Sequence, residues 1–244
     1  MKILCVIPSR IGSTRLAKKP LLLIKNKPMV QLVYENAITC KILNKVIVAT
    51  DSEDIAQVIR NINGNVVMTD PLLPTGTDRV AAVAKNFSDV DVVINLQGDE
   101  PFVTSYMLEQ LVAPYLKGEN PCMTTLANKF NKEEDYNNPG VVKVITDINH
   151  DAIYFSRSPI PYFRENINNK SMPVYRHIGL YAFTRDFLLK YTNLARTPLE
   201  QTELLEQLRA VEYGFKIRVC LTEHKTLEIN TQAEYEQAII NLAN

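Results

Sequence analysis

The stretch "KVIVATDSEDIAQVIRNINGNVVMT", residues 45–69, shows the pattern that decides the fold. A short apolar run at residues 45–50 is followed by a helical pattern with Ser52 at its N-cap position, and a second apolar run follows at residues 65–69. A strand, a helix and a strand in this order form the right-handed crossover unit of a parallel sheet. The stretch therefore predicts an α/β fold.

The same alternation extends to both sides of this unit. We expect a Rossmann-like fold, with a mostly parallel sheet and helices on both faces. Ligands of such sheets bind beyond the carboxyl ends of the strands. The basic loop after the first strand, Asp51, "PTGTDR" (residues 74–79) and "QGDEP" (residues 97–101) all follow predicted strands. The remaining elements predicted before residue 120 are strands at 2–7 and 91–97 and helices at 27–40, 77–87 and 104–116.

The pattern becomes less regular after about residue 120. We interpret this part as a mixed-sheet extension of one domain, residues 1–244, with the ligand edge in about 1–120 and the extension in about 121–244. Thr197 as cap, Pro198 at the first position and Gly214 at the end predict one long helix. Strands of the extension are predicted at residues 122–128, 141–147, 152–158, 174–184 and 216–222.

Composition limits the class of protein. Lys plus Arg and Asp plus Glu both number 27 in 244 residues, so the balanced charge argues against binding to nucleic acid. No apolar run reaches membrane-spanning length, and the N-terminal run is too short for a signal peptide. Four scattered cysteines without a Cys-x-x-Cys pair fit a reducing compartment, and we expect a cytoplasmic protein without a membrane partner.

Positive charge is concentrated in "IPSRIGSTRLAKKP", residues 7–20. A loop between a strand and the next element offers unpaired backbone N–H groups, and the neighbouring cations favour phosphate. Arg10 and Arg15 can grip phosphate oxygens in pairs, whereas Lys19 acts as a point charge. The alternative is a merely solvated basic loop.

Two carboxylates, Asp99 and Glu100, follow the predicted strand in "VVINLQGDEP", residues 92–101. A carboxylate at the buried end of a strand is costly without a cationic partner, and a nucleotide-bound Mg²⁺ would provide one. A turn in which Gly98 bends the chain is the alternative reading. Together with the basic loop, the carboxylates favour metal-assisted phosphoryl chemistry.

The chain resembles the 3-deoxy-manno-octulosonate cytidylyltransferases, or CMP-Kdo synthetases, nearly from end to end. The motifs that carry the resemblance are "IPSRIGSTRLAKKPL", "ATDSEDI", "PTGTDR", "NLQGDEP", "YFSRSPIP", "YRHIGLYAF" and "LEQLRAVEYG". The resemblance implies a nucleotidyltransferase fold and transfer of CMP from CTP to Kdo, with release of pyrophosphate, for lipopolysaccharide synthesis. It also implies Mg²⁺ as cofactor and a homodimer, and it assigns the second part of the chain to sugar binding and dimerisation.

Residue by residue, the resemblance implies three groups of contacts. Catalysis falls to Lys19, Asp99 and Arg10. Nucleotide binding falls to Pro8, Arg10, Ser13, Arg15, Lys19, Thr75, Arg79 and Gln97. Sugar binding falls to Arg157, His177, Tyr181, Glu206 and Gln207, and metal binding to Asp99.

The residues support these roles on chemical grounds. CTP carries about four negative charges, so attack at its α-phosphate requires cations and a metal. Arg157 could bind the carboxylate of Kdo with two hydrogen bonds. Glu206 and Gln207 lie on the predicted long helix and could bind hydroxyls, although a solvated helix face is the alternative. Tyr181 follows His177 by four residues and shares its strand face.

The chain departs from the family pattern near its C-terminus. The family has Val-Asp-Thr there, and its aspartate is a second metal ligand, whereas this chain has Asn230 in "LEINTQAEY". Glu228 lies two residues earlier in the same predicted strand and projects to the same side. Our hypothesis is that Glu228 and Asn230 together replace the missing ligand.

Three alternatives remain for the function. The sugar could be a related acid, 8-amino-Kdo or a sialic acid, since the segment before residue 178 is shorter than in several relatives. A nucleotide-binding protein without turnover is a second alternative, supported by Asn230 alone. A dinucleotide oxidoreductase fits the alternation but lacks the glycine fingerprint.

Overall fold

The computed structural model describes residues 1–12, 16–130, 133–164, 174–224, 229 and 231–243. The chain divides into two compact units. The first unit comprises Met1–Glu109 and Thr226–Asn244, and the second comprises Gln110–Lys225. The change of sequence pattern near residue 120 lies close to this division, but the C-terminal segment returns to the first unit.

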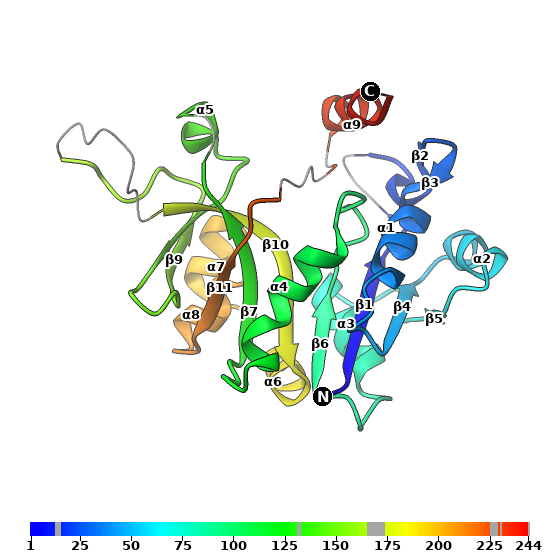
Figure 1. The fold of residues 1–244 in the computed structure, drawn as a ribbon, viewed down its shortest axis with the longest axis horizontal. Coiled ribbons are helices and arrows are strands. Elements are labelled where there is room, and N and C mark those ends of the chain that lie inside the picture. Colours follow the sequence, from blue (N-terminus) through cyan, green and yellow to red (C-terminus); the bar gives the residue numbers. More distant parts are fainter. Residues whose placement is uncertain (13–15, 131–132, 165–173, 225–228, 230, 244) are drawn as a thin grey trace. The chain divides into compact units, whose positions relative to one another are not determined.

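The first unit contains a parallel sheet of four strands in the order β6 (Val92–Asn95), β1 (Ile3–Ser9), β4 (Lys45–Thr50) and β5 (Val66–Met68) (Figure 1). Every residue of β1 and β6 is buried. Burial on both faces explains why these strands read as continuous apolar runs instead of alternating ones. The predicted α/β fold with a parallel sheet is confirmed.

Three helices connect these strands: α1 (Met29–Ile38), α2 (Glu53–Asn61) and α3 (Gly76–Ala84). From β1 to β5 the chain steps in one direction across the sheet, and from β5 to β6 it returns past β1. Because such crossovers are right-handed, α1 and α2 cover one face and α3 covers the other. Ser52 stands at the N-cap position of α2, as predicted, although its side chain makes no capping hydrogen bond.

A C-terminal helix completes the first unit. Helix α9 (Gln232–Ala243) packs through Ala238 and Tyr235 on a cluster that includes Ile24 and Met29. The Tyr235 hydroxyl also donates to the carbonyl of Leu23, at 2.7 Å. The remaining elements of this unit are the 3-10 helix η1 (Lys19–Leu21), the strands β2 (Leu23–Ile24) and β3 (Lys27–Pro28), and the first turns of α4 (Ser105–Leu116).

The second unit contains a mixed sheet in the order β11, β7, β10, β8 and β9. Among the described strand pairs of this unit, β11 and β7 are parallel and the others are antiparallel. The mixed sheet predicted for this part of the chain is therefore confirmed. The elements of this unit are β7 (Met123–Asn128), α5 (Glu133–Asn137), β8 (Lys143–Thr146), β9 (Ala152–Ser156), β10 (Val174–Thr184), α6 (Arg185–Tyr191), α7 (Pro198–Glu203), α8 (Leu208–Glu212) and β11 (Ile217–Leu221).

The single long helix predicted from Pro198 to Gly214 is wrong, because the structure has two short helices, α7 and α8. Leu204 ends α7 in the left-handed conformation, with φ of 52°. The turn lets Arg209 of α8 reach back to the buried Glu200 of α7, with Nε–Oε2 2.8 Å and Nη2–Oε1 2.5 Å. Nine residues of a straight helix would span about 13.5 Å, so one continuous helix could not form this pair.

The buried Arg209–Glu200 pair should be essential to the stability of the second unit. Both side chains are at least 92% buried, at 5% and 8% exposure. Arg209→Met leaves the Glu200 carboxylate without its partner, and we expect a loss of about 3–5 kcal/mol in the free energy of unfolding by urea titration. Arg60→Met is the control, because its partner Glu53 is exposed and the expected change is under about 0.5 kcal/mol. Equal losses in the two variants would contradict this account.

Candidate functional site

The candidate site of the first unit lies beyond the carboxyl ends of β1 and β6. The chain leaves β1 for one side of the sheet and reaches β6 on the other, so the topological switch point lies between these strands. Their pairing ends at Val6 and Asn95, and Leu96 makes one further bond to Val6. Beyond this point the two segments continue into the basic loop and the "QGDEP" loop, where sequence reasoning expected a ligand.

Lys19 and Asp99 meet at this edge. The Lys19 ammonium lies 2.5 Å from Asp99 Oδ2, and the two side chains are only 14% and 18% exposed. The second carboxylate oxygen, Asp99 Oδ1, is buried and makes no hydrogen bond to any described residue. The prediction that the basic loop and this carboxylate converge is confirmed by this contact.

Gly98 allows the close approach of the two loops. A β-carbon on Gly98 would lie 2.4 Å from Ser9 Oγ and 3.1 Å from the carbonyl of Pro8. Only glycine fits there, so the 97–101 loop can lie directly against the end of β1. The backbone N–H of Ile229 donates to the carbonyl of Asp99, at 3.3 Å, which brings the C-terminal segment to the same edge.

Arg79 has a different setting from the one expected of a nucleotide contact. Its side chain is 3% exposed and its Nη2 lies 3.0 Å from Asp51 Oδ2, while its Nη1 donates to the Thr69 hydroxyl. Asp51 Oδ1 accepts from the N–H of Ile11, at 3.4 Å. Arg79 therefore orients the carboxylate that holds the start of the basic loop.

Thr75 is the N-cap of α3, and Gln97 lies close to Gly76 in the first turn of this helix. Thr75 and Asp78 form a capping box, in which each side chain accepts from the backbone N–H of the other residue at 3.1 Å, and the Thr75 hydroxyl also donates to Asp78 Oδ2 at 2.7 Å. Gln97 Nε2 donates to Asn95 Oδ1, at 2.8 Å, and Asn95 Nδ2 donates to the Thr77 hydroxyl, at 3.1 Å. Pro8 is buried at the end of β1 and Arg10 is exposed just after it.

In the second unit, Arg157 binds backbone carbonyls. Its guanidinium donates to the carbonyls of Glu203, Pro139 and Leu204, at 2.7, 3.1 and 3.4 Å. The Glu203 carboxylate accepts from the backbone N–H of Arg157, at 2.9 Å, and from the Ser156 hydroxyl, at 2.7 Å. Three of the five N–H groups of the guanidinium are thereby engaged by described residues, and the other two make no hydrogen bond within the described part of the chain.

Glu206 and Gln207 lie in the turn between α7 and α8 instead of on the predicted helix. The Tyr191 hydroxyl donates to the carbonyl of Glu206, at 2.6 Å. Gln207 is 3% exposed, and its Nε2 is a buried donor without a hydrogen-bond partner among the described residues. A buried amide with an unused donor is an unusual cost in a folded protein, and a ligand that accepts this bond would remove it.

His177 and Tyr181 share one face of β10, as predicted, with ring centroids 5.6 Å apart. His177 Nε2 lies 2.9 Å from the Thr125 hydroxyl, which itself donates toward the carbonyl of Ile178 or Leu180. The hydroxyl proton is thereby used, so Nε2 carries the proton of this pair and Nδ1 is an acceptor. Burial lowers the pKa of His177 to about 3, because it penalises the charged ring.

Four predicted site residues lie outside the described part of the chain: Ser13, Arg15, Glu228 and Asn230. Sequence reasoning noted Asp51 only for its place after a strand, and it missed Asn95, Thr77 and Lys143. Lys143 is completely buried and donates to the carbonyls of Asn138, Val141 and Arg157 at 2.8, 2.9 and 2.6 Å. Burial lowers the pKa of Lys143, and nothing in its sequence context signals this role.

Asp99 fits a divalent cation. Its Oδ1 is a buried oxygen without a partner among the described residues, and carboxylate oxygen is a preferred ligand of Mg²⁺. No group of three or more His, Cys, Asp or Glu side chains in the described ranges could hold a metal by itself. A site with one or two protein carboxylates, completed by phosphate oxygens, is typical of nucleotide-bound Mg²⁺.

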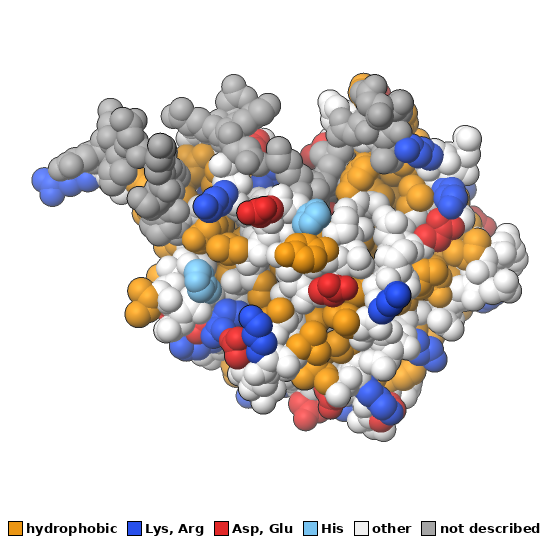
Figure 2. All heavy atoms as spheres, viewed as in Figure 1, with side chains coloured by type: hydrophobic (Ala, Val, Ile, Leu, Met, Phe, Trp, Pro, Cys, Tyr) orange, Lys and Arg blue, Asp and Glu red, His pale blue; other side chains and the backbone are white. Residues whose placement is uncertain are grey.

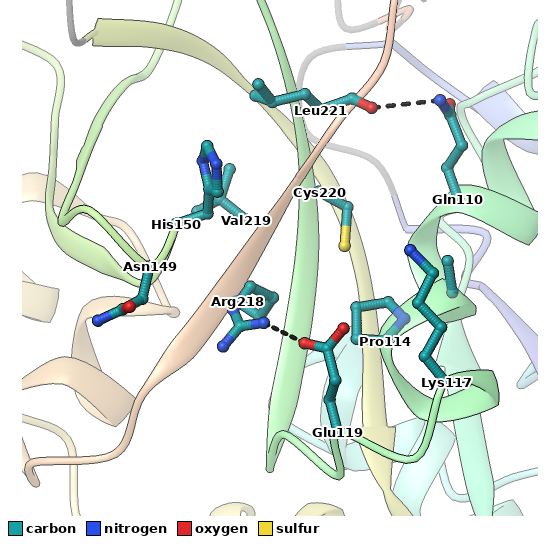
Figure 3. Close-up of a pocket in the computed structure, with 11 residues that line it drawn as sticks. Gln110, Pro114, Lys117, Glu119, Asn149, His150, Arg218, Val219, Cys220 and Leu221 are labelled. Atoms are coloured by element: carbon teal, nitrogen blue, oxygen red, sulfur yellow. Dashed lines mark hydrogen bonds and ion pairs between the residues drawn. The ribbon is translucent and has the colours of Figure 1, made fainter.

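The second unit also contains a hollow of about 320 Å³ beside β11 and the C-terminal half of α4 (Figure 3). One of its cations, Arg218, is already paired: it contacts Glu119, and its Nε lies 2.8 Å from Asp151 Oδ1. Gln110 Nε2 crosses the hollow to the carbonyl of Leu221, at 3.2 Å. The hollow contains none of the predicted site residues.

The visible surface agrees with the balanced charge of the chain. Figure 2 shows acidic and basic side chains of the described residues interspersed with hydrophobic and uncharged ones on the face in view. In the part of the chain that the structure describes, no helix has the length and apolar character needed to span a bilayer.

Comparison with known proteins identifies relatives of the chain along nearly its whole length. A family model described as cytidylyltransferase matches residues 4–217. The chain is 52% identical over 238 residues to 3-deoxy-manno-octulosonate cytidylyltransferase of Acaryochloris marina, which covers 98% of this chain and 96% of that protein. The identity to the protein of the same name from Geobacter metallireducens is 42% over 251 residues, covering 100% and 98%.

Solved structures extend the similarity to three dimensions. CMP:2-keto-3-deoxy-manno-octonic acid synthetase complexed with CTP superimposes with a TM-score of 0.92 at 37% identity, covering 100% of this chain and 99% of that one. A 4-diphosphocytidyl-2C-methyl-D-erythritolsynthase from Anaerococcus prevotii, at 14% identity and a TM-score of 0.66, shares the fold alone. The chain belongs to the cytidylyltransferase family and, within it, to the 3-deoxy-manno-octulosonate cytidylyltransferases.

Proposed function

We propose that this enzyme transfers CMP from CTP to Kdo, which gives CMP-Kdo and pyrophosphate. The observation that carries the proposal is the partly buried Lys19–Asp99 pair at the switch point of a parallel sheet, in which Asp99 Oδ1 has no hydrogen-bond partner among the described residues. Relatives of 40–52% identity bear the name 3-deoxy-manno-octulosonate cytidylyltransferase, and the most similar fold described above was solved with CTP. Production of CMP-Kdo would supply lipopolysaccharide synthesis.

The phosphates of CTP would bind at the basic loop. Arg10 is exposed at the end of β1, and Lys19 lies beside Asp99 at the carboxyl edge of the sheet. Ser13 and Arg15 belong to the same loop sequence, and we assign them to phosphate binding as well. Cations at this place neutralise the charge that develops on the α-phosphate and on the leaving pyrophosphate.

Mg²⁺ is the proposed cofactor, with Asp99 as its main protein ligand. The ion would supply neutralisation of phosphate charge and acidify a bound hydroxyl. The bond between the N–H of Ile229 and the carbonyl of Asp99 supports a contribution from the sequence neighbours of Ile229, Glu228 and Asn230. An asparagine carbonyl can ligate Mg²⁺ but removes one negative charge, which Glu228 would restore.

The nucleoside would bind near the first turn of α3. A β-carbon on Gly76 would lie 3.4 Å from Pro8 Cγ and 3.5 Å from Gln97 Oε1, so these three residues lie close together. Thr75 is the N-cap of the same helix. The structure supports an indirect role for Arg79, because its guanidinium is buried against Asp51.

The sugar would bind to residues of the second unit. The two N–H groups of Arg157 that remain available suit the Kdo carboxylate, and the unused Nε2 of Gln207 suits a sugar hydroxyl. Neutral His177 offers its Nδ1 as an acceptor, and Tyr181 lies against the same ring. Glu206 shares the turn with Gln207 and would complete the hydroxyl contacts.

The reaction itself needs binding and charge neutralisation more than a protein base. The anomeric hydroxyl of Kdo attacks the α-phosphorus of CTP, the new oxygen–phosphorus bond forms, and the bond to pyrophosphate breaks. Lys19 and Arg10 would hold the phosphates in line for this attack. No covalent enzyme intermediate is part of this proposal.

The setting of the enzyme is a separate proposal. All four cysteines are free, which supports a reducing compartment, the cytoplasm. We propose a homodimer from the resemblance to the family, and we propose that the two units together act as one nucleotidyltransferase domain.

The names of the relatives favour Kdo over 8-amino-Kdo or a sialic acid, and they do not favour binding without turnover.

The direct test is pyrophosphate release with CTP, Mg²⁺ and Kdo. We expect turnover by the wild type and a decrease in kcat of about 10²–10³-fold for Asp99→Asn, because the variant loses the anionic partner of Lys19 and the metal. Asp89→Asn is the control, since Asp89 is exposed and pairs only with Lys2 among the described residues. Absence of turnover with Kdo, or equal rates in the two variants, would refute the proposal.

The neutral state of His177 predicts a pH dependence of stability. Its pKa is about 3 in the folded protein, below the ordinary 6.5, so the unfolded chain takes up a proton first as the pH falls. The contribution of neutral His177 to the free energy of unfolding is therefore fully present above pH 6.5, and it decreases progressively as the pH falls toward 3. Between pH 7 and pH 5 we expect the wild type to lose roughly 1–2 kcal/mol more than His177→Gln in urea unfolding. Parallel pH profiles of the two proteins would show that the ring is not kept neutral.

A further inference from the structure

The turn between α7 and α8, residues 204–207, contains Glu206 and Gln207. Its first residue, Leu204, adopts the left-handed conformation and is 78% exposed, so its side chain adds little packing to the turn. The positions of Glu206 and Gln207 therefore depend on contacts that other elements of the second unit make with them.

Tyr191, the last residue of α6, supplies two such contacts. Its hydroxyl donates to the carbonyl of Glu206, at 2.6 Å, and the guanidinium carbon of Arg209 lies 5.0 Å from the centre of its ring. The ring is 1% exposed and packs beside Phe183 and Phe187, with centroids 5.8 and 5.9 Å apart. Burial raises the pKa of Tyr191, so the hydroxyl keeps its proton and remains a donor. One fixed ring thereby contacts both the turn and the start of α8.

The carbonyl of Glu206 is the point at which this contact acts. It accepts from the Tyr191 hydroxyl and also from the backbone N–H of Arg209, at 3.1 Å, which closes the first turn of α8. A carbonyl oxygen has two lone pairs, and both are used here. This carbonyl belongs to the planar peptide unit that joins Glu206 to Gln207. The hydroxyl of Tyr191 therefore orients the backbone from which the Gln207 side chain extends.

Gln207 is held in a position that is unfavourable without a ligand. Its side chain is almost completely buried, and its Nε2 has no hydrogen-bond partner among the described residues. A buried donor without a partner costs free energy, and a turn that could move would relieve this cost by exposing the amide to water. The bond from Tyr191 opposes such a movement of the turn.

We propose that Tyr191 is a positioning residue for the sugar: by holding the carbonyl of Glu206, it keeps the Gln207 amide in place for an acceptor on the ligand. Tyr191 does not itself contact the sugar in this account. Its effect is on affinity, because a turn that is already ordered loses less conformational freedom when the sugar binds. The inference rests on the proposed function for the identity of the ligand.

Tyr191→Phe tests this role, because phenylalanine keeps the ring and removes only the hydroxyl. Tyr34→Phe is the matched control: Tyr34 is 5% exposed, and its hydroxyl accepts from the backbone N–H of Asn65, at 3.0 Å, in the first unit. Kdo is titrated by calorimetry with Mg²⁺ and CMP, which has no pyrophosphate to release and therefore does not react. We expect the dissociation constant of Kdo to increase about three- to tenfold in Tyr191→Phe and to stay within about twofold in Tyr34→Phe. The affinity for CTP should stay within about twofold in both variants.

Hydrogen exchange of residues 204–209 provides a second measurement, which needs no ligand. We expect faster exchange in Tyr191→Phe than in the wild type or in Tyr34→Phe, because the Glu206 carbonyl loses one of its two donors. Unchanged Kdo affinity or unchanged exchange in Tyr191→Phe, or an equal loss of Kdo affinity in Tyr34→Phe, would overturn the inference. A wild type that binds Kdo but releases no pyrophosphate from CTP would refute only the proposed function.

Discussion

The carboxylate of Asp99 is the group on which the first unit's site depends. It stands at the carboxyl end of β6, is 18% exposed, and binds the Lys19 ammonium through one oxygen. A carboxylate so far removed from water needs cationic partners, and the basic loop provides one. The second oxygen is left for another cation, so a single side chain joins the phosphate loop to the expected metal. Gly98 makes this possible by letting the loop pass against Ser9.

Support for this edge comes from polar groups that do not themselves face the ligand. Arg79 forms an ion pair with Asp51, and the Asp51 carboxylate also accepts a hydrogen bond from the backbone N–H of Ile11. Asn95 accepts a hydrogen bond from the side-chain amide of Gln97. Such groups are costly to bury singly and stabilising once all their bonds are made. The second unit follows the same principle, since Lys143 is buried and bound to three carbonyls. Rigid support of this kind keeps the groups of a site within the narrow limits that phosphoryl transfer requires.

The parallel sheet and its ligand edge could be predicted from the sequence, because alternation of apolar runs and helical patterns leaves few topologies. Lys19 and Asp99 could be placed together for the same reason, as both follow strands of one sheet. The break at Leu204 could not be predicted, since the helical pattern continues through it and the buried Arg209–Glu200 pair is a tertiary contact. The hydrogen bonds that join Asn95 to Thr77 and Gln97 could not be predicted either, because the sequence does not show which residues a polar side chain in a strand will contact. Ser52 had the right position for a cap but made no capping bond.

Binding of Mn²⁺ in the absence of nucleotide, followed by electron paramagnetic resonance, tests the central claim most directly. If Asp99 holds both Lys19 and the metal, Lys19→Met should bind Mn²⁺ several-fold more tightly than the wild type, because a neighbouring positive charge is gone. Asp99→Asn should bind it several-fold more weakly, because the carboxylate is lost. The same affinity in all three proteins would contradict the account, since it would place the metal away from the pair.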